Sequence, residues 1–229
     1  MKNIKYILLI VVILCSCNSW AQAIKICTND GKSIIVPFAK LDSIITIDYE
    51  DEVKKGFVDM GVSVKWATCN VGAEHPQELG LYFAWGEINP KESYSIDNCK
   101  TLGKDITDIA SNPNYDAALF NWGSPARMPT SDEYQELIDN CESTWTTFKE
   151  VEGMLLISKI NGNSLFFPAT GRYEGNTLSY VGEIGNYWSS TPYEANNEGA
   201  YSFGIRNDGE CWRGWSYRDY GHTVRAVSE

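Results

Sequence analysis

Residues 200–215, AYSFGIRNDGECWRGW, contain two short segments rich in aromatic residues on either side of Asn207-Asp208-Gly209. Asn, Asp and Gly tolerate the positive φ angles of tight turns better than other residues do. Segments of this length that flank such a turn are typical of paired antiparallel strands. The stretch therefore predicts a β-hairpin with strands at 200–205 and 210–215.

The surrounding sequence predicts further strands and two short helices. A second hairpin is expected at Met154–Ile160 and Ser164–Pro168, which are joined by an Asn-Gly-Asn turn. Thr130, followed three residues later by Glu133, is typical of a capping box and predicts a helix that ends near Asn140. The other expected elements are strands at Val62–Trp66, Tyr187–Ser190 and Thr223–Val227, a short helix at Asp116–Trp122, and a long loop at 87–114. Leu81–Gly86 is a second apolar run. The predicted fold class is α+β, with two short helices and twisted antiparallel sheets.

Residues 1–21 have the pattern of an export signal. Two lysines precede an apolar run at Tyr6–Leu14, which is too short to span a bilayer. Small residues at Ser19 and Ala21 favour cleavage after Ala21. Alternatively, Leu14-Cys15-Ser16-Cys17 resembles a lipobox, in which Cys17 is acylated and membrane attachment is by lipid only. Both readings predict an exported protein.

Between this signal and the main domain, the sequence predicts a small β unit at 22–49. Its expected strands are Ile24–Cys27, Ser33–Val36 and Ile44–Ile47, with a tight turn at Asn29-Asp30-Gly31. Residues 50–56 are charged and lack periodicity, which is typical of a linker. The remaining residues, 57–229, are expected to form one domain.

Composition excludes several classes of protein. The 229 residues carry 19 Lys and Arg against 30 Asp and Glu, a formal charge of −11. Nucleic-acid binding needs clustered basic residues, so no nucleic-acid partner is expected. With 43% hydrophobic and 13% aromatic residues, the chain is not of the disordered class.

Cysteine chemistry stays open at this level. Beyond the signal the cysteines are Cys27, Cys69, Cys99, Cys141 and Cys211. In an exported protein one or two disulfides are expected, although buried free thiols fit each position equally well. The spacing of the cysteines along the chain does not indicate which of them form disulfides.

No catalytic constellation stands out in the sequence. The common nucleotide-binding, zinc-protease and serine-hydrolase motifs are missing, and the chain has only two histidines, His75 and His222. A loop position is expected for His75, and a surface or structural role for His222. We therefore expect no catalytic residue, no metal site and no cofactor.

The last quarter of the sequence is instead rich in Tyr and Trp interleaved with Asn, Gly, Ser and Arg. Amphipathic rings among flexible polar residues are typical of recognition surfaces. The residues of this kind that follow the turn at 207–209 are Trp212, Arg213, Trp215, Tyr217, Arg218 and Tyr220.

Several motifs, in order, resemble those of the Fibrobacter succinogenes major paralogous domain family. They are VKWATCNVGA (64–73), YFAWGE (82–87), DAA (116–118), WG (122–123), RMPT (127–130), EY (133–134), NYWSS (186–190) and GHTVRAV (221–227). The resemblance covers about 57–227. It implies a C-type-lectin-like fold, related to the formylglycine-generating-enzyme branch, in exported and often surface-attached proteins.

The resemblance also implies roles for individual residues. Trp66, Trp85 and Trp188 are expected in the core, and Arg127 and Arg225 as buried scaffold residues. Residues Trp212 to Tyr220 lie where such domains display a variable ligand face. Cys211 has no cysteine partner in the C-terminal part, so formylglycine-generating activity is not expected, and the calcium-lectin motifs are missing.

The leading functional hypothesis is an exported, non-catalytic binding or adhesion module. It is expected either in the cell envelope or on the outer surface, or as a secreted protein. Its partner would be a glycan or a host or bacterial surface protein, contacted through the aromatic-rich C-terminal face. The alternatives are a structural or appendage component of the envelope, or the variable protein of a diversity-generating retroelement. An enzyme ranks last.

Overall fold

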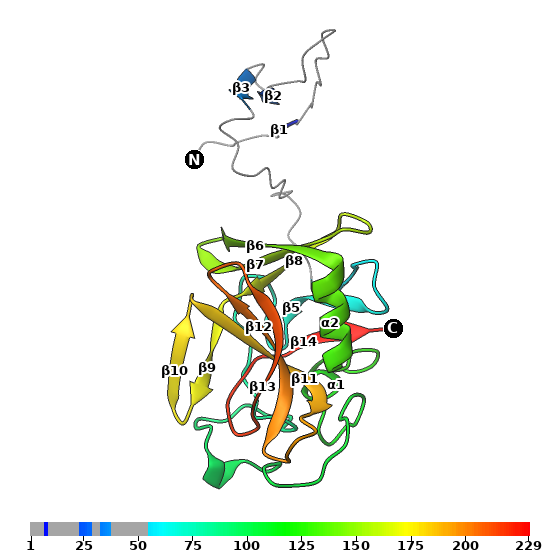
Figure 1. Ribbon diagram of the computed structural model, residues 1–229, viewed down its shortest axis with the longest axis vertical. Coiled ribbons are helices and arrows are strands. Elements are labelled where there is room, and N and C mark those ends of the chain that lie inside the picture. Colours follow the sequence, from blue (N-terminus) through cyan, green and yellow to red (C-terminus); the bar gives the residue numbers. More distant parts are fainter. Residues whose placement is uncertain (1–6, 9–22, 29–32, 38–54) are drawn as a thin grey trace. The chain divides into compact units, whose positions relative to one another are not determined.

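The computed structural model describes residues 7–8, 23–28, 33–37 and 55–229, and the chain divides into two units, Met1–Glu50 and Asp51–Glu229 (Figure 1). In the first unit, β1 (Ile7–Leu8), β2 (Ala23–Thr28) and β3 (Ser33–Pro37) form an antiparallel sheet in the order β1-β2-β3. Strands β2 and β3 confirm two of the expected strands. Ile7 and Leu8 of the predicted signal pair with Thr28 and Cys27. The turn at 29–31, the strand at 44–47, Cys17, Ala21 and most of the 50–56 linker lie outside the described residues.

The second unit is built around a five-stranded sheet in the order β10-β9-β11-β12-β13. All neighbours are antiparallel except β9 and β11, which meet in parallel at Gly171 and Gly185. The β12–β13 pairing confirms the hairpin expected around 207–209. The strands are β9 (Thr170–Glu174), β10 (Thr177–Val181), β11 (Ile184–Pro192), β12 (Gly199–Arg206) and β13 (Cys211–Tyr217).

Two three-stranded sheets complete the unit. One is the meander β6 (Cys141–Phe148), β7 (Val151–Ser158) and β8 (Ser164–Pro168), in which the β7–β8 hairpin is as expected. The other has the order β14-β5-β4 and joins the two ends of the unit in one sheet. Its strands are β4 (Phe57–Asp59), β5 (Lys65–Asn70) and β14 (Arg225–Ser228).

Both expected helices are present. Helix α1 (Ala117–Trp122) is capped by the Asp116 carboxylate, which accepts from the Leu119 backbone N–H. Helix α2 (Ser131–Asn140) has the expected capping box between Thr130 and Glu133. The 3₁₀ helix η2 (Ile96–Asn98) lies within the long loop at 87–114.

Some expected strands were wrong or missed. The apolar run at Leu81–Gly86 forms no strand: the chain turns at Gly80 and Gly86, both at positive φ, and only Phe83 forms a bridge, with His222. The strand expected at Val62–Trp66 begins instead at Lys65 and continues to Asn70. Strands β4, β6, β9 and β10 were missed because their residues are largely polar or only partly buried, which weakens the hydrophobic pattern.

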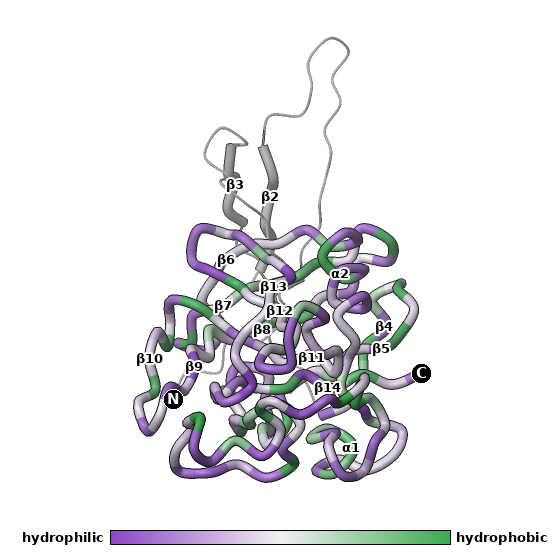
Figure 2. The backbone as a smooth tube through the Cα atoms, turned by 60° about the horizontal axis from the view of Figure 1, so that its bottom comes forward, coloured by the Kyte–Doolittle hydropathy of each residue, from purple (hydrophilic) through white to green (hydrophobic). Residues whose placement is uncertain are grey.

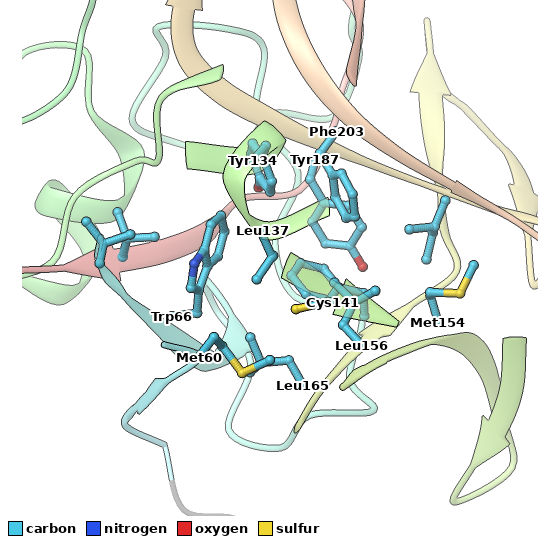
Figure 3. Packing of buried hydrophobic residues seen from close by; sticks show 14 residues of the cluster. Met60, Trp66, Tyr134, Leu137, Cys141, Met154, Leu156, Leu165, Tyr187 and Phe203 are labelled. Carbon is cyan, nitrogen blue, oxygen red and sulfur yellow. The ribbon is translucent and has the colours of Figure 1, made fainter. Parts of the chain in front are cut away.

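A sheet-rich α+β fold is therefore observed. Three hydrophobic clusters among residues 55–229 form its core, and two of them are large. In the first, Tyr134 of α2 stacks on Phe203 of β12 with ring centroids 4.8 Å apart, and Trp66 lies 5.0 Å from Tyr134 (Figure 3). The second contains Trp85 and Trp188. All three tryptophans are fully buried, as expected.

The two scaffold arginines differ in their degree of burial. Arg225 is 0% exposed and donates to Asn70 Oδ1 and to the Ala67 and Phe166 carbonyls. Arg127 is partly buried and forms ion pairs with Glu133 and Glu229. Both expectations of a structural role are confirmed, although only Arg225 is completely enclosed.

Hydrophobic segments along the second unit are short and alternate with hydrophilic ones (Figure 2). Among the described residues, no helix has both the length and the apolar character needed to cross a membrane.

Candidate functional site

Strand β13 presents alternate side chains to opposite sides of an edge of the five-stranded sheet. Arg213, Trp215 and Tyr217 point to one side, and all three are exposed, Trp215 to 44% and Tyr217 to 43%. Trp212 belongs to the other side, because successive side chains of a strand alternate. The strand thus places three of the six expected contact residues together.

These exposed side chains belong to a continuous chain of ring contacts. Trp215 stacks on Tyr193 with a centroid distance of 4.9 Å, and Tyr193 meets Tyr201 edge to face at 5.4 Å. In the other direction Trp215 contacts Tyr217 at 5.3 Å, and Tyr217 contacts Tyr220 at 5.7 Å. Together with Arg213, these five rings are called the aromatic surface below.

Gly199, the first residue of β12, allows this stacking. It lies opposite Tyr217 in the β12–β13 register, two residues before Tyr201. A Cβ atom at position 199 would lie 3.0 Å from the Trp215 ring and 3.2 Å from the Tyr193 Cβ. The lack of a side chain therefore lets two rings from different segments come together over the backbone.

An arginine lies at each end of the ring contacts, and each forms an ion pair. The Arg213 guanidinium lies 5.5 Å from the Tyr201 ring and pairs with Asp132 of α2 at 2.8 Å. At the other end, the Arg172 guanidinium lies 5.4 Å from the Tyr220 ring and pairs with Glu174 at 2.6 Å. The positive charges are thus balanced locally.

A carboxylate also lies beside the rings. Glu194 follows Tyr193 in the loop between β11 and β12, and its carboxylate lies near enough to the Tyr201 phenol to influence its pKa. Partial burial, followed by the interaction with Glu194, raises the pKa of Tyr201 above its usual value. The surface thus combines ring faces with phenol, carboxylate and guanidinium groups able to bind a polar ligand.

Trp212 does not belong to this surface, contrary to expectation. It covers Gly204 of β12, where an added Cβ would meet the Trp212 ring at 2.2 Å. The Arg206 guanidinium lies 5.5 Å from the same ring. The two-residue period of the strand separates Trp212 from Trp215.

Arg218 was also expected at the ligand face, and the structure corrects this. Its side chain is 1% exposed and lies 4.3 Å from the Trp85 ring. It donates to the backbone carbonyls of Gly199, Thr101 and Lys104. Arg218 therefore ties the end of β13 to the long loop at 87–114 and is a structural residue.

Sequence reasoning missed Tyr193 and Tyr201 as members of the surface. Both precede β13 and stand among many other aromatic residues. The sequence signal that could have found them is Gly199, which lies between Tyr193 and Tyr201. Its missing side chain leaves room for the rings of Tyr193 and Trp215 to meet. Without the β12–β13 register, this signal could not be linked to Trp215.

A Ser–His contact lies on the opposite side of β13. Ser216 Oγ is 3.3 Å from His222 Nε2, and His222 is 0% exposed, stacked 4.1 Å from Trp188. Burial, followed by repulsion from Arg172, lowers the pKa of His222 to about 3. General-base catalysis works best with a pKa near the working pH, so this histidine is a poor base.

In the part of the chain that the structure describes, no three His, Cys, Asp or Glu side chains are grouped so as to hold a metal ion. At the aromatic surface the Glu194 carboxylate is an oxygen donor, but it belongs to no such group of three.

Comparison of the chain with protein-family models, with curated proteins and with solved structures gave no match.

Proposed function

We propose that residues 57–229 form a non-catalytic binding module of an exported protein, and that the aromatic surface contacts the partner. The observation that carries this proposal is the continuous chain of rings from Tyr201 to Tyr220, in which Trp215 and Tyr217 are exposed and the other three rings are partly buried. Monomeric domains normally bury large rings, and exposed clusters of Trp and Tyr are typical of contact surfaces.

The favoured partner is a glycan. The C–H faces of pyranose rings stack on Trp and Tyr, while hydroxyl groups pair with phenol, carboxylate and guanidinium groups such as those of Tyr201, Glu194 and Arg213. Ion pairing of Arg213 and Arg172 leaves little uncompensated positive charge for an anionic partner. A host or bacterial surface protein uses the same residue types and is the other outcome of the test.

The C-type-lectin-like fold and the relation to the Fibrobacter succinogenes major paralogous domain family are part of this proposal. They are supported by the positions of motif residues: Trp66, Trp85, Trp188 and Arg225 are all completely buried. These residues would form the scaffold, and the exposed side of β13 with its neighbouring rings would supply the ligand contacts.

Export is supported by the N-terminal sequence pattern. The mature chain is expected to begin at Gln22, whereas lipid attachment would leave an acylated Cys17 at its start. N-terminal sequencing together with palmitate labelling distinguishes the two forms. Recovery of the full-length chain in the cytosol would contradict both.

A combined array of glycans and surface proteins, probed with the full chain, tests the binding function. Trp215→Ala and Tyr217→Ala should each reduce affinity for a hit at least 10-fold, about 1.4 kcal/mol or more. Trp212→Ala is the matched control, because it removes a ring from the same strand on the opposite side. Unchanged binding by both surface variants, or equal loss in the control, would contradict the proposal. Hits confined to proteins would replace the glycan as partner.

A further inference from the structure

Two cysteines meet where the β6 meander packs against the five-stranded sheet. Cys141 is the first residue of β6 and belongs to the first core cluster, where it lies near Leu156 and Leu165 (Figure 3). Cys211 is the first residue of β13 and packs against the same cluster.

A hydrogen bond joins the two segments that contain these cysteines. Ser143 Oγ donates to the Gly209 carbonyl at 3.1 Å. Ser143 comes two residues after Cys141, so both side chains are on the same face of β6. Gly209 comes two residues before Cys211. This hydrogen bond therefore brings the start of β6, which contains Cys141, close to the start of β13, which contains Cys211.

The pKa of the Cys211 thiol responds to both Ser143 and Cys141. Burial raises this pKa most, Ser143 lowers it and Cys141 raises it further, as expected for groups that lie near one another. The two other cysteines of the second unit have different surroundings. Cys69 Sγ lies 3.3 Å from the Ala73 carbonyl, and Cys99 Sγ lies 3.7 Å from Thr101 Oγ1.

We propose that Cys141 and Cys211 are joined by an intramolecular disulfide under oxidising conditions. The bond would connect the end of α2 and the start of β6 to the start of β13. It would thus anchor the strand that carries Trp215 and Tyr217, independently of what that strand binds.

The reaction can proceed by exchange with a small-molecule disulfide such as oxidised glutathione. One protein thiolate attacks that disulfide, forms a mixed disulfide and releases one glutathione thiolate. The second protein thiolate then attacks the mixed disulfide and releases the second glutathione. The two protein thiols lose two protons and two electrons, and oxidised glutathione is reduced to two thiols.

Burial controls the rate of this reaction. It raises the pKa of both thiols to about 11, so thiolate is scarce in the folded protein near neutral pH. The exchange should therefore be fast while the chain folds and slow once it has folded. Closing the long loop between these positions should raise the melting temperature by roughly 5–10 °C.

The test is to refold the reduced full chain in a glutathione redox buffer at pH 8.5 and to map its disulfides by mass spectrometry without reduction. The expected product links the peptides that contain Cys141 and Cys211, with a loss of about 2 Da. Cys69→Ser and Cys99→Ser are matched controls and should keep this cross-link, whereas Cys141→Ser and Cys211→Ser should abolish it.

The disulfide map of the wild-type chain tests the proposal even if one of the variants fails to fold. Linkage of Cys141 or Cys211 to a different cysteine would overturn the proposal. Recovery of both thiols free after refolding, under conditions that oxidise Cys99, would overturn it equally.

Discussion

Trp215 and Tyr193 lie face to face, with planes 9° apart, although they come from an edge strand and from the loop that precedes its neighbour. Their contact passes over Gly199, which has no side chain to separate them. One face of the indole is thus covered by the phenol, while 44% of Trp215 remains accessible. An aromatic ring supported in this way loses little conformational freedom when a ligand stacks on it.

Gly199→Ala should weaken binding with little effect on folding. The added methyl would lie 3.0 Å from the Trp215 ring, so the indole must move away from Tyr193. We expect a 3- to 10-fold loss of affinity, about 1 kcal/mol, in a direct binding titration. The matched control is Gly214→Ala, whose methyl approaches Trp212 at 3.1 Å on the opposite side. Equal effects of the two substitutions would show that Gly199 has no special role.

Arg218→Met and Arg213→Met should separate stability from binding. Loss of the Arg218 guanidinium leaves the carbonyls of Gly199, Thr101 and Lys104 without this donor, at a cost of roughly 3 kcal/mol in the free energy of unfolding. Loss of the exposed Arg213–Asp132 pair should cost under about 1 kcal/mol. Urea denaturation measures both. The ligand-face assignment of Arg218 would be restored if its removal left stability unchanged and abolished binding.

Trp188→Ala should destabilise the domain far more than Trp215→Ala. Trp188 is fully buried, and its indole N–H donates to the Phe83 carbonyl at 2.8 Å. Truncation of a buried Trp costs roughly 3–5 kcal/mol, whereas a partly exposed ring costs much less. Thermal unfolding compares the two variants directly. Similar melting temperatures would argue against the core position of Trp188.

Acid should destabilise the fold through His222. In the unfolded chain this imidazole takes up a proton below about pH 6.5, but in the folded protein burial lowers its pKa to about 3. The contribution of His222 to the free energy of unfolding is therefore complete above pH 6.5 and is lost progressively as the pH falls toward 3. Linkage gives a loss of about 2 kcal/mol between pH 7 and pH 5.

Urea denaturation at both pH values measures this loss of stability. His222→Gln should remove the part of the loss that His222 causes, because glutamine does not take up a proton in this range. Direct titration of the wild-type His222 resonance by NMR provides a check that does not depend on the variant. A His222 imidazole that gains its proton near pH 6 would contradict the prediction.

Chelation should leave binding unchanged. Among residues 55–229, the aromatic surface included, no three acidic, His or Cys side chains are grouped so as to hold a metal ion. Dialysis against EDTA, followed by the same binding titration with and without added Ca²⁺, tests this. Recovery of lost affinity by Ca²⁺ would point to a calcium-dependent site.

Local features of this protein could be predicted from its sequence because neighbouring residues determine them. The capping box of Thr130 and Glu133 starts α2, and the turns at 161–163 and 207–209 join paired strands. Strand β6 escaped this reasoning because Glu, Ser and Thr dominate it, and its place is set by pairing with β7.

The candidate surface shows the same division. The sequence by itself determined that aromatic residues follow the turn at 207–209, and the two-residue period of a strand already separates Trp212 from Trp215. Only the tertiary structure decided that Arg218 is buried, because its acceptors lie on Thr101 and Lys104, more than a hundred residues earlier. It alone also brought Tyr193 over Gly199 to Trp215, since contacts between distant segments depend on register and packing, which no local pattern encodes.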